Sequence, residues 1–217
     1  MNRYDIFESI SQRENGALSE ENTLLARIAH ELRRAVDNSN THEAQYGTGR
    51  ENVAEINEKE KRVAETWAKS HNAWFSFSDI FRLGPPGPSG SEADTYIGEG
   101  YIYKVNNLMH CDDSILLALA KFMIFNQIFP DVAYSLIGFT GFDGRNIYPV
   151  VSQPYIRGCV PATRLEIDYY MAALGFEAQG NGLFTNNDYI LKDIHPKNVL
   201  KDENGEIFVI DAEVLLR

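Results

Sequence analysis

The stretch KDIHPKNVLKDENGEIFVID, residues 192–211, decides how this chain is interpreted. It contains Asp193, then Asn198 five residues later, then Asp211 at the end of an apolar run. Asn204-Gly205 lies between two apolar segments, which predicts a β-hairpin with a tight turn. Such a hairpin, with Asp211 at the end of its second strand, returns Asp211 toward Asp193 and Asn198. The sequence therefore predicts two carboxylates and an amide oxygen at one place in the fold.

This set of oxygen groups suits Mg²⁺. The ion is usually held by one or two carboxylates together with substrate phosphates, not by a complete protein cage. With Asn198 and Asp211 as metal ligands, Asp193 is available to orient a hydroxyl group or to accept its proton. Taken alone, Asp193 and Asn198 could instead cap and turn a loop. The additional presence of Pro196, the hairpin and Asp211 favours the metal site.

The preceding segments predict the order strand, strand, helix, strand, strand. Residues 93–105, ADTYIGEGYIYKV, predict two strands around a turn at Gly98–Gly100. Residues 113–128 predict a buried apolar helix, ended by Pro130. Residues 133–156 predict two further strands, joined at Gly141–Gly144. This alternation indicates an α+β domain.

Two more elements are predicted between this region and the decisive stretch. Thr163 and Glu166 form a capping-box pattern at the start of a helix over 163–174, with Gly175 as its stop signal. A hairpin turning at Asn186-Asn187 follows.

The N-terminal third has a different pattern. Apolar residues recur at helical spacing in 17–36, after Ser19 as the candidate N-cap, and again in 51–70. A polar, glycine-containing stretch separates these two predicted helices. Residues 81–91, FRLGPPGPSGS, mark the change to β-structure. We therefore expect a helical extension at 1–72 and the main domain at 73–217.

Charge and composition exclude several classes of partner. The 217 residues carry a net charge of -11, and the pI is about 4.9. Such a chain repels nucleic acid and anionic membrane surfaces, so we expect neither as a partner. Two cysteines are too few for a disulfide framework, and the N-terminus lacks the apolar core of a signal peptide. These features predict a cytoplasmic protein.

The motif D-I-x-P-x-N-V-L, followed by a hairpin and I-D, resembles the catalytic loop and metal-binding strand of protein-kinase-like phosphotransferases. The stretch from about Trp74 to Leu215 is similar to the Ser/Thr/Tyr kinase-like domain found in polyvalent proteins of bacterial mobile elements and phages. The segments that carry this similarity are YIYKVNNL, FNQIFPDVAYSLIGF, YPVVSQPYI, PATRLEIDYYMAALGF and KDIHPKNVLKDENGEIFVIDAE. It implies an α+β, protein-kinase-like two-lobed fold with an antiparallel N-lobe sheet and a reduced C-lobe, preceded by the helical extension.

The resemblance also implies ATP and Mg²⁺ as cofactors and assigns roles to residues. Asp193 corresponds to the catalytic aspartate, and Asn198 and Asp211 to the metal ligands. Lys104, on a strand after a glycine turn, corresponds to the lysine that holds phosphates; the alternative is a surface lysine with a packed stem. The other nucleotide-binding candidates are Gly90, Gln153, Tyr155 and Ile156, the last three at the expected hinge between lobes.

Two of these candidates have an equally good structural interpretation. Gly90 could bring a backbone N–H near phosphates or be a flexible linker residue. His195 stands where kinases often have lysine, so it could contact the transferred phosphate or be an ordinary loop histidine.

The chain also departs from the kinase pattern. Leu191-Lys192 replace the usual His-Arg, and Ala212-Glu213 replace Phe-Gly. Six residues follow Asp211, so we expect no activation segment. The predicted apolar helix contains no glutamate, which leaves the usual carboxylate partner of Lys104 unassigned.

Three functions follow from these matches and departures. The leading one is ATP- and Mg²⁺-dependent phosphoryl transfer to an unidentified hydroxyl acceptor, on a protein or a small molecule. The second is a catalytically silent pseudokinase that acts as a nucleotide-sensing or protein-binding module. The third is a small-molecule phosphotransferase of the aminoglycoside-kinase type, since an acidic site attracts cationic acceptors.

Overall fold

The computed structural model describes residues 19–43, 53–141 and 146–217. The chain divides into two compact units. Unit 1 contains the chain up to Met123 together with Tyr134–Gln153, and unit 2 contains Ile124–Ala133 and Pro154–Arg217. The turn predicted at Gly141–Gly144 lies, except for Gly141, outside the described residues.

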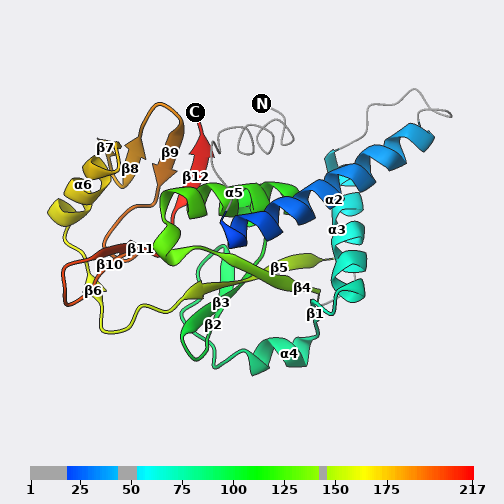
Figure 1. Ribbon diagram of the computed structural model, residues 1–217, viewed down its shortest axis with the longest axis horizontal. Coiled ribbons are helices and arrows are strands. Elements are labelled where there is room, and N and C mark those ends of the chain that lie inside the picture. Colours follow the sequence, from blue (N-terminus) through cyan, green and yellow to red (C-terminus); the bar gives the residue numbers. More distant parts are fainter. Residues whose placement is uncertain (1–18, 44–52, 142–145) are drawn as a thin grey trace. The chain divides into compact units, whose positions relative to one another are not determined.

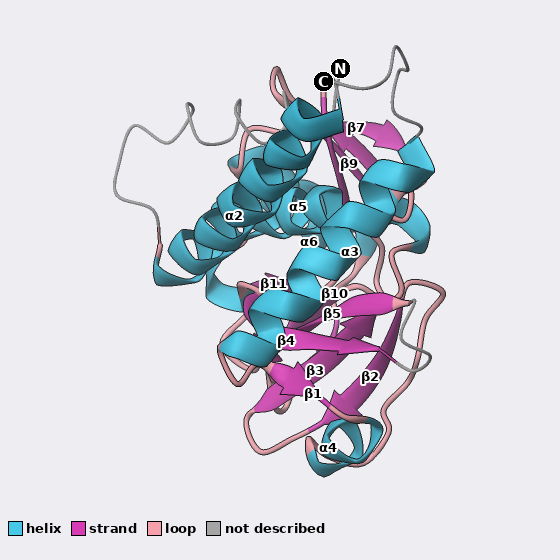
Figure 2. Cartoon of the chain, turned by 90° about the vertical axis from the view of Figure 1, so that its right-hand side faces the viewer, coloured by secondary structure: helices cyan, strands magenta, loops and turns pink. Residues whose placement is uncertain are grey.

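Unit 1 contains a five-stranded sheet with the order β1-β4-β5-β3-β2 (Figure 2). Its strands are β1 (Trp74–Phe75), β2 (Ala93–Ile97), β3 (Tyr101–Asn106), β4 (Ser135–Gly141) and β5 (Ile147–Pro154). The predicted β2–β3 hairpin is confirmed, with Thr95 opposite Lys104. β2 pairs antiparallel with β3, and β4 with β5, whereas β1 runs parallel to β4. The mixed α and β architecture agrees with the predicted kinase-like fold and its helical extension.

Among the described residues, four α-helices belong wholly or partly to unit 1. They are α2 (Glu20–Glu43), α3 (Val53–Ser70), α4 (Phe77–Arg82) and the first part of α5 (Ile115–Ile128). Ser19 is the N-cap of α2, since its Oγ accepts the Asn22 N–H at 3.2 Å. The prediction that α2 ends near residue 36 is wrong, because the helix continues to Glu43. Neither glycine nor proline occurs between residue 36 and Gly47, so no residue with a strong stop signal ends the helix earlier.

Helices α2 and α3 pack against the sheet at β4. Figure 1 shows α2 and α3 next to β4, with which both are in contact. The indole of Trp67 on α3 meets the ring of Phe139 edge-on, with 6.1 Å between ring centroids. α4 lies beside β1, and its Ile80 packs in a cluster with Tyr96, Val105 and Val150. The predicted extension therefore shares a core with the sheet.

A close backbone contact fixes the passage from α3 into the sheet. The N–H of Phe139 donates to the carbonyl of Ala73 at 2.9 Å. A Cβ atom on Gly138 would lie 2.0 Å from the same carbonyl oxygen. Because only glycine allows this approach, Gly138 is required for the junction between α3 and β4.

A polar network, buried at Glu60, Lys61 and Ser114 and exposed at Asp113, joins α3 to the start of α5. Glu60, which is fully buried, accepts hydrogen bonds from the Ser114 hydroxyl at 2.8 Å and the Leu116 N–H at 3.2 Å. The carboxylate thus satisfies N-terminal donors of α5 and lies at the positive end of its dipole. Lys61, also buried, forms an ion pair with Asp113 at 2.7 Å. We call the residues Glu60, Lys61, Asp113 and Ser114, together with the Leu116 N–H, the α3–α5 network.

Unit 2 contains one further α-helix and two small sheets. The sheets have the orders β11-β10-β6 and β12-β9-β8-β7. Their strands are β6 (Val160–Pro161), β7 (Glu177–Gly180), β8 (Leu183–Thr185), β9 (Tyr189–Lys192), β10 (Val199–Lys201), β11 (Ile207–Val209) and β12 (Glu213–Leu216). Helix α6 (Arg164–Ala173) begins with the predicted capping box of Thr163 and Glu166. Both predicted hairpins, β8–β9 and β10–β11, are confirmed.

None of the helices in the described part of the chain is both long and apolar enough to cross a bilayer.

Candidate active site

The loop after β9 is held in a defined conformation by backbone bonds. Asp193 has a φ of 63°, in the left-handed region that aspartate tolerates better than most residues. The next residue, Ile194, is fully buried, and its N–H donates to the Gly182 carbonyl at 3.1 Å. The Asn198 N–H donates to the His195 carbonyl at 2.8 Å and closes a turn. Pro196 occupies the second position of this turn, where its fixed φ is favourable.

Three of the predicted site residues meet in this loop. Asn198 Nδ2 donates to the Asp193 backbone carbonyl at 3.0 Å and to its Oδ2 at 2.9 Å. His195 Nε2 lies 3.0 Å from Asp193 Oδ1. Both carboxylate oxygens of Asp193 therefore have a partner, while the side chain remains 62% exposed. We call Asp193, His195 and Asn198 the Asp193 cluster.

Asp211 approaches this cluster through the backbone. The N–H of Ile210 donates to the Asn198 carbonyl at 2.9 Å, which brings the following residue, Asp211, beside Asn198. The prediction that Asp211 ends the hairpin strand is wrong, because β11 ends at Val209 and Asp211 lies between β11 and β12. Its exposed carboxylate makes no hydrogen bond or ion pair with any residue in 19–43, 53–141 or 146–217.

Two departures from the kinase pattern contact each other. Lys192, at the position where kinases have arginine, lies opposite Glu213 in the β9–β12 pairing. Lys192 Nζ and Glu213 Oε2 are 3.3 Å apart. This cross-strand ion pair links the strand before Asp193 to the strand after Asp211. The sequence analysis did not predict this ion pair, because the pair depends on strand β12, which was not predicted.

The residues available for a metal fit Mg²⁺. Asn198 uses Nδ2 toward Asp193, which leaves Oδ1 without a bond to the described residues, and Asp211 has both carboxylate oxygens available. The described part of the chain contains no group of three or more His, Cys, Asp or Glu side chains that could hold a metal. One carboxylate and one amide oxygen match an ion that takes its remaining ligands from phosphates and water.

In unit 1, Lys104 lies on β3 with a partly buried side chain. Its Nζ donates to the Tyr134 hydroxyl at 2.9 Å and lies 4.9 Å from the centre of the same ring. Tyr134 is buried and immediately precedes β4. Tyr134 was not among the predicted site residues, and nothing in its sequence context pairs it with a lysine thirty residues earlier.

The other nucleotide-binding candidates occupy different environments. The Gly90 N–H donates to the Ala93 carbonyl at 3.2 Å, so this amide already has an acceptor within the loop. Gln153 is buried in β5 and is the last residue of unit 1. Tyr155, 42% exposed, and Ile156, partly buried, follow in unit 2. The boundary between the units thus falls within the segment predicted as a hinge.

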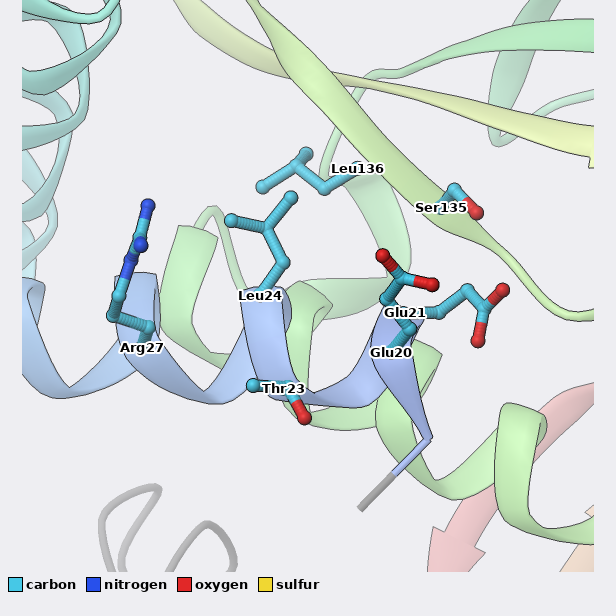
Figure 3. A pocket seen from close by; sticks show the side chains of 7 residues that line it. All are labelled: Glu20, Glu21, Thr23, Leu24, Arg27, Ser135 and Leu136. Carbon is cyan, nitrogen blue, oxygen red and sulfur yellow. The ribbon is translucent and has the colours of Figure 1, made fainter.

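Two surface hollows lie elsewhere in unit 1. The first, of about 450 Å³, lies between the start of α2 and β4 and is lined by Glu20, Glu21, Arg27 and Ser135 among others (Figure 3). The second, of about 570 Å³, lies between α2 and α3 and is lined by residues that include Arg34, Arg62 and His71. Neither contains a predicted site residue.

Glu166, in the first turn of α6, forms an ion pair with Lys201 of β10. Glu166 accepts from Lys201 and from the hydroxyl and N–H of Thr163. The Lys201 bond contributes most, and together with the Thr163 bonds it lowers the pKa of Glu166 from 4.5 to about 2.

The chain matches a known protein family. Residues 57–217 match the family described as serine/threonine/tyrosine kinases found in polyvalent proteins. The matched region begins within α3 and includes every residue of the Asp193 cluster, Asp211 and Lys104. A comparison with curated proteins found no match.

Proposed function

Since this chain belongs to the family of serine/threonine/tyrosine kinases found in polyvalent proteins, we propose that it transfers the γ-phosphoryl group of Mg²⁺–ATP to a hydroxyl group. The observation that carries the proposal is the arrangement of Asp193, Asn198 and Asp211. The Asn198 amide holds Asp193, and the Asn198 backbone holds the residue before Asp211. The two proposed metal ligands, Asn198 and Asp211, and the separate carboxylate of Asp193 are thus linked by hydrogen bonds between neighbouring segments of the chain.

Each group of unit 2 has one role. Asn198 Oδ1 and the Asp211 carboxylate hold Mg²⁺, which neutralises phosphate charge when bound. Asp193 accepts a hydrogen bond from the acceptor hydroxyl and takes its proton. The acceptor oxygen forms a bond to the γ-phosphorus while the bond from that phosphorus to the β,γ-bridging oxygen breaks, and ADP leaves. Asp193 is exposed, so an acceptor hydroxyl has access to it.

In unit 1, Lys104 provides a positive charge for nucleotide phosphates. The Tyr134 hydroxyl and ring hold its ammonium group while the stem is partly buried, so the lysine is oriented before a ligand binds. Gln153, Tyr155 and Ile156 contact the nucleotide base in this proposal. Gly90 has a smaller part, because its N–H must leave Ala93 before it can donate to a phosphate.

The direct test is transfer of label from [γ-³²P]ATP in the presence of Mg²⁺. Purified protein is incubated with a protein fraction or with a small-molecule fraction, and the labelled product is identified. The test variant is Asp211→Asn, which removes a ligand charge from the metal site, and its matched control is Glu203→Gln, an exposed acid of the same unit. We expect Asp211→Asn to weaken Mg²⁺–ATP binding and Glu203→Gln to leave it unchanged.

The outcomes separate the three functions. Label on a protein or on a small molecule supports phosphotransfer and identifies the class of acceptor. Binding of Mg²⁺–ATP without transfer supports the silent nucleotide-sensing module. No binding of Mg²⁺–ATP at millimolar concentration contradicts the proposal.

A further inference from the structure

His195 has both ring nitrogens engaged. Nε2 lies 3.0 Å from Asp193 Oδ1, and Nδ1 faces the Lys197 N–H at 3.3 Å. Its own carbonyl accepts the Asn198 N–H at 2.8 Å, so backbone and side chain of His195 both belong to the turn that ends at Asn198. The ring is therefore fixed from two sides.

These contacts determine the tautomer of the neutral ring. A backbone N–H is always a donor, so Nδ1 must be the acceptor of the Lys197 bond and carries no proton. The proton is then on Nε2, the nitrogen that faces Asp193. His195 consequently directs its N–H-bearing nitrogen to one oxygen of the Asp193 carboxylate, at 3.0 Å, while the other oxygen accepts from Asn198.

We infer that His195 is a positioning residue for Asp193, an inference that rests on the proposed phosphotransfer. The hydrogen bond of Asn198 to one oxygen and the polar contact of His195 with the other restrict the rotation of the carboxylate. An exposed aspartate without such partners samples several rotamers, and each reacts only while correctly oriented. The Nε2–H of His195 keeps Asp193 in one orientation for the acceptor hydroxyl.

This role differs from the phosphate contact that the kinase resemblance suggests for residue 195. A histidine that binds phosphate directs a ring N–H away from the protein, toward the ligand. Here the N–H-bearing nitrogen is directed to Asp193 and the other nitrogen to a backbone donor. The two roles predict different kinetics, because a phosphate contact changes ATP affinity and a positioning contact changes the rate of transfer.

The first experiment measures steady-state transfer for two substitutions. His195→Leu removes the donor, and His195→Gln keeps an N–H at a similar reach from the backbone. We expect His195→Leu to lower kcat roughly tenfold, the effect of losing one polar contact to a charged group, with the KM for ATP unchanged. His195→Gln should recover most of that loss. The matched control is His110→Leu, an exposed histidine near Glu92 in unit 1, which should match the wild type.

A rise in the KM for ATP with unchanged kcat in His195→Leu would overturn the positioning role in favour of phosphate contact. Wild-type kinetics in that variant would overturn any role of the ring.

The second experiment does not depend on activity. Nitrogen-15 NMR of the histidine rings distinguishes a protonated from a bare ring nitrogen. We expect the Nε2–H tautomer for His195 in the wild type, and a mixture of tautomers in Asp193→Ala, where the acceptor is lost. An Nδ1–H tautomer in the wild type overturns the inference. If the wild type transfers no phosphate but His195 has the Nε2–H tautomer, the proposed function fails while the contact to Asp193 stands.

Discussion

The α3–α5 network and the Asp193 cluster are both built from charged and polar side chains, with bonds of similar length. They differ in burial. Glu60 and Lys61 are 0% and 4% exposed, whereas the side chains of Asp193 and His195 are 62% and 37% exposed. Removing a partner from a buried charge leaves it unsolvated, while water replaces the partner of an exposed one. Because the bond lengths are similar, the difference in burial is what predicts the roles: the network contributes to stability, and the cluster is available for chemistry.

The sharpest contrast comes from Asp193→Asn. The substitution keeps the shape and removes the charge that accepts the hydroxyl proton, so we expect single-turnover transfer to slow by roughly 10² to 10⁴. Mg²⁺–ATP affinity should stay within about threefold, because Asp193 is not assigned to the metal, and the melting temperature should hardly change. A drop in stability comparable to that of a buried-network variant would remove the distinction between the two regions.

Glu60→Ala should have the opposite profile. It leaves the Ser114 hydroxyl and the Leu116 N–H buried without their acceptor, at a cost of about 3 kcal/mol in the free energy of unfolding. Urea denaturation measures this loss. The matched control is Glu58→Ala on the same helix. The Glu58 side chain is 53% exposed, and its Oε1 lies 3.8 Å from Lys61 Nζ, a longer separation than either bond of Glu60. Equal losses in the two variants would show that burial does not determine the effect.

Lys104→Met tests a residue of intermediate exposure. We expect Mg²⁺–ATP to bind about tenfold more weakly, the usual effect of losing one charge-assisted bond. The unfolding transition should remain close to that of the wild type, since the methionine stem keeps most of the packing. Isothermal titration and thermal denaturation measure the two quantities. A large loss of stability with unchanged nucleotide affinity would assign Lys104 to the fold through Tyr134.

The contribution of Glu166 to the free energy of unfolding is expected to depend on pH. The folded pKa of Glu166, about 2, is below the ordinary 4.5, so the native state favours the ionised form. The resulting stabilisation is complete above about pH 4.5 and declines as the pH falls toward 2. Urea midpoints of the wild type and of Glu166→Gln, measured over this range, should differ by a constant amount above pH 4.5 and converge below it. A difference that does not change with pH would mean that the ionised form is not favoured.

The smallest effect is expected from the Lys192–Glu213 pair. Both side chains are partly exposed, at 45% and 26%, and exposed pairs contribute roughly 0.2–1 kcal/mol. A double-mutant cycle with Lys192→Met and Glu213→Gln measures the coupling free energy. A coupling free energy above about 2 kcal/mol would show that this exposed pair stabilises the fold as strongly as the α3–α5 network, and would contradict the comparison.

The sequence predicted those elements whose signals are local. The capping box at Thr163 and Glu166, the Asn204-Gly205 turn and the apolar residues of α5 each specify their own conformation within a few residues. The contact of Asp193 with Asn198 also follows from a short spacing. These parts of the fold and of the candidate site could be predicted because chain proximity brings the groups together.

What the sequence did not predict depends on long-range pairing. Glu60 lies at helical spacing from the buried Ala64 and Trp67, but its hydrogen-bond donor Ser114 is 54 residues away in the chain. Strand β12 has four residues and is defined by its pairing with β9. Tyr134 meets Lys104 because β4 and β3 both belong to the sheet. Such contacts follow from tertiary packing, which spacing along one sequence does not reveal.

Gly138 has a consequence for which substitutions this chain can accept. Any side chain there would collide with the Ala73 carbonyl, and that carbonyl belongs to the backbone, which no rotamer change can move aside. In a library of all single substitutions selected for folded protein, we therefore expect position 138 to accept glycine alone, whereas the solvent-exposed Gly90, with no atom near its missing Cβ, accepts many residues. Mutational tolerance at these two glycines reports the docking of a helix onto a sheet, independently of any catalytic assay.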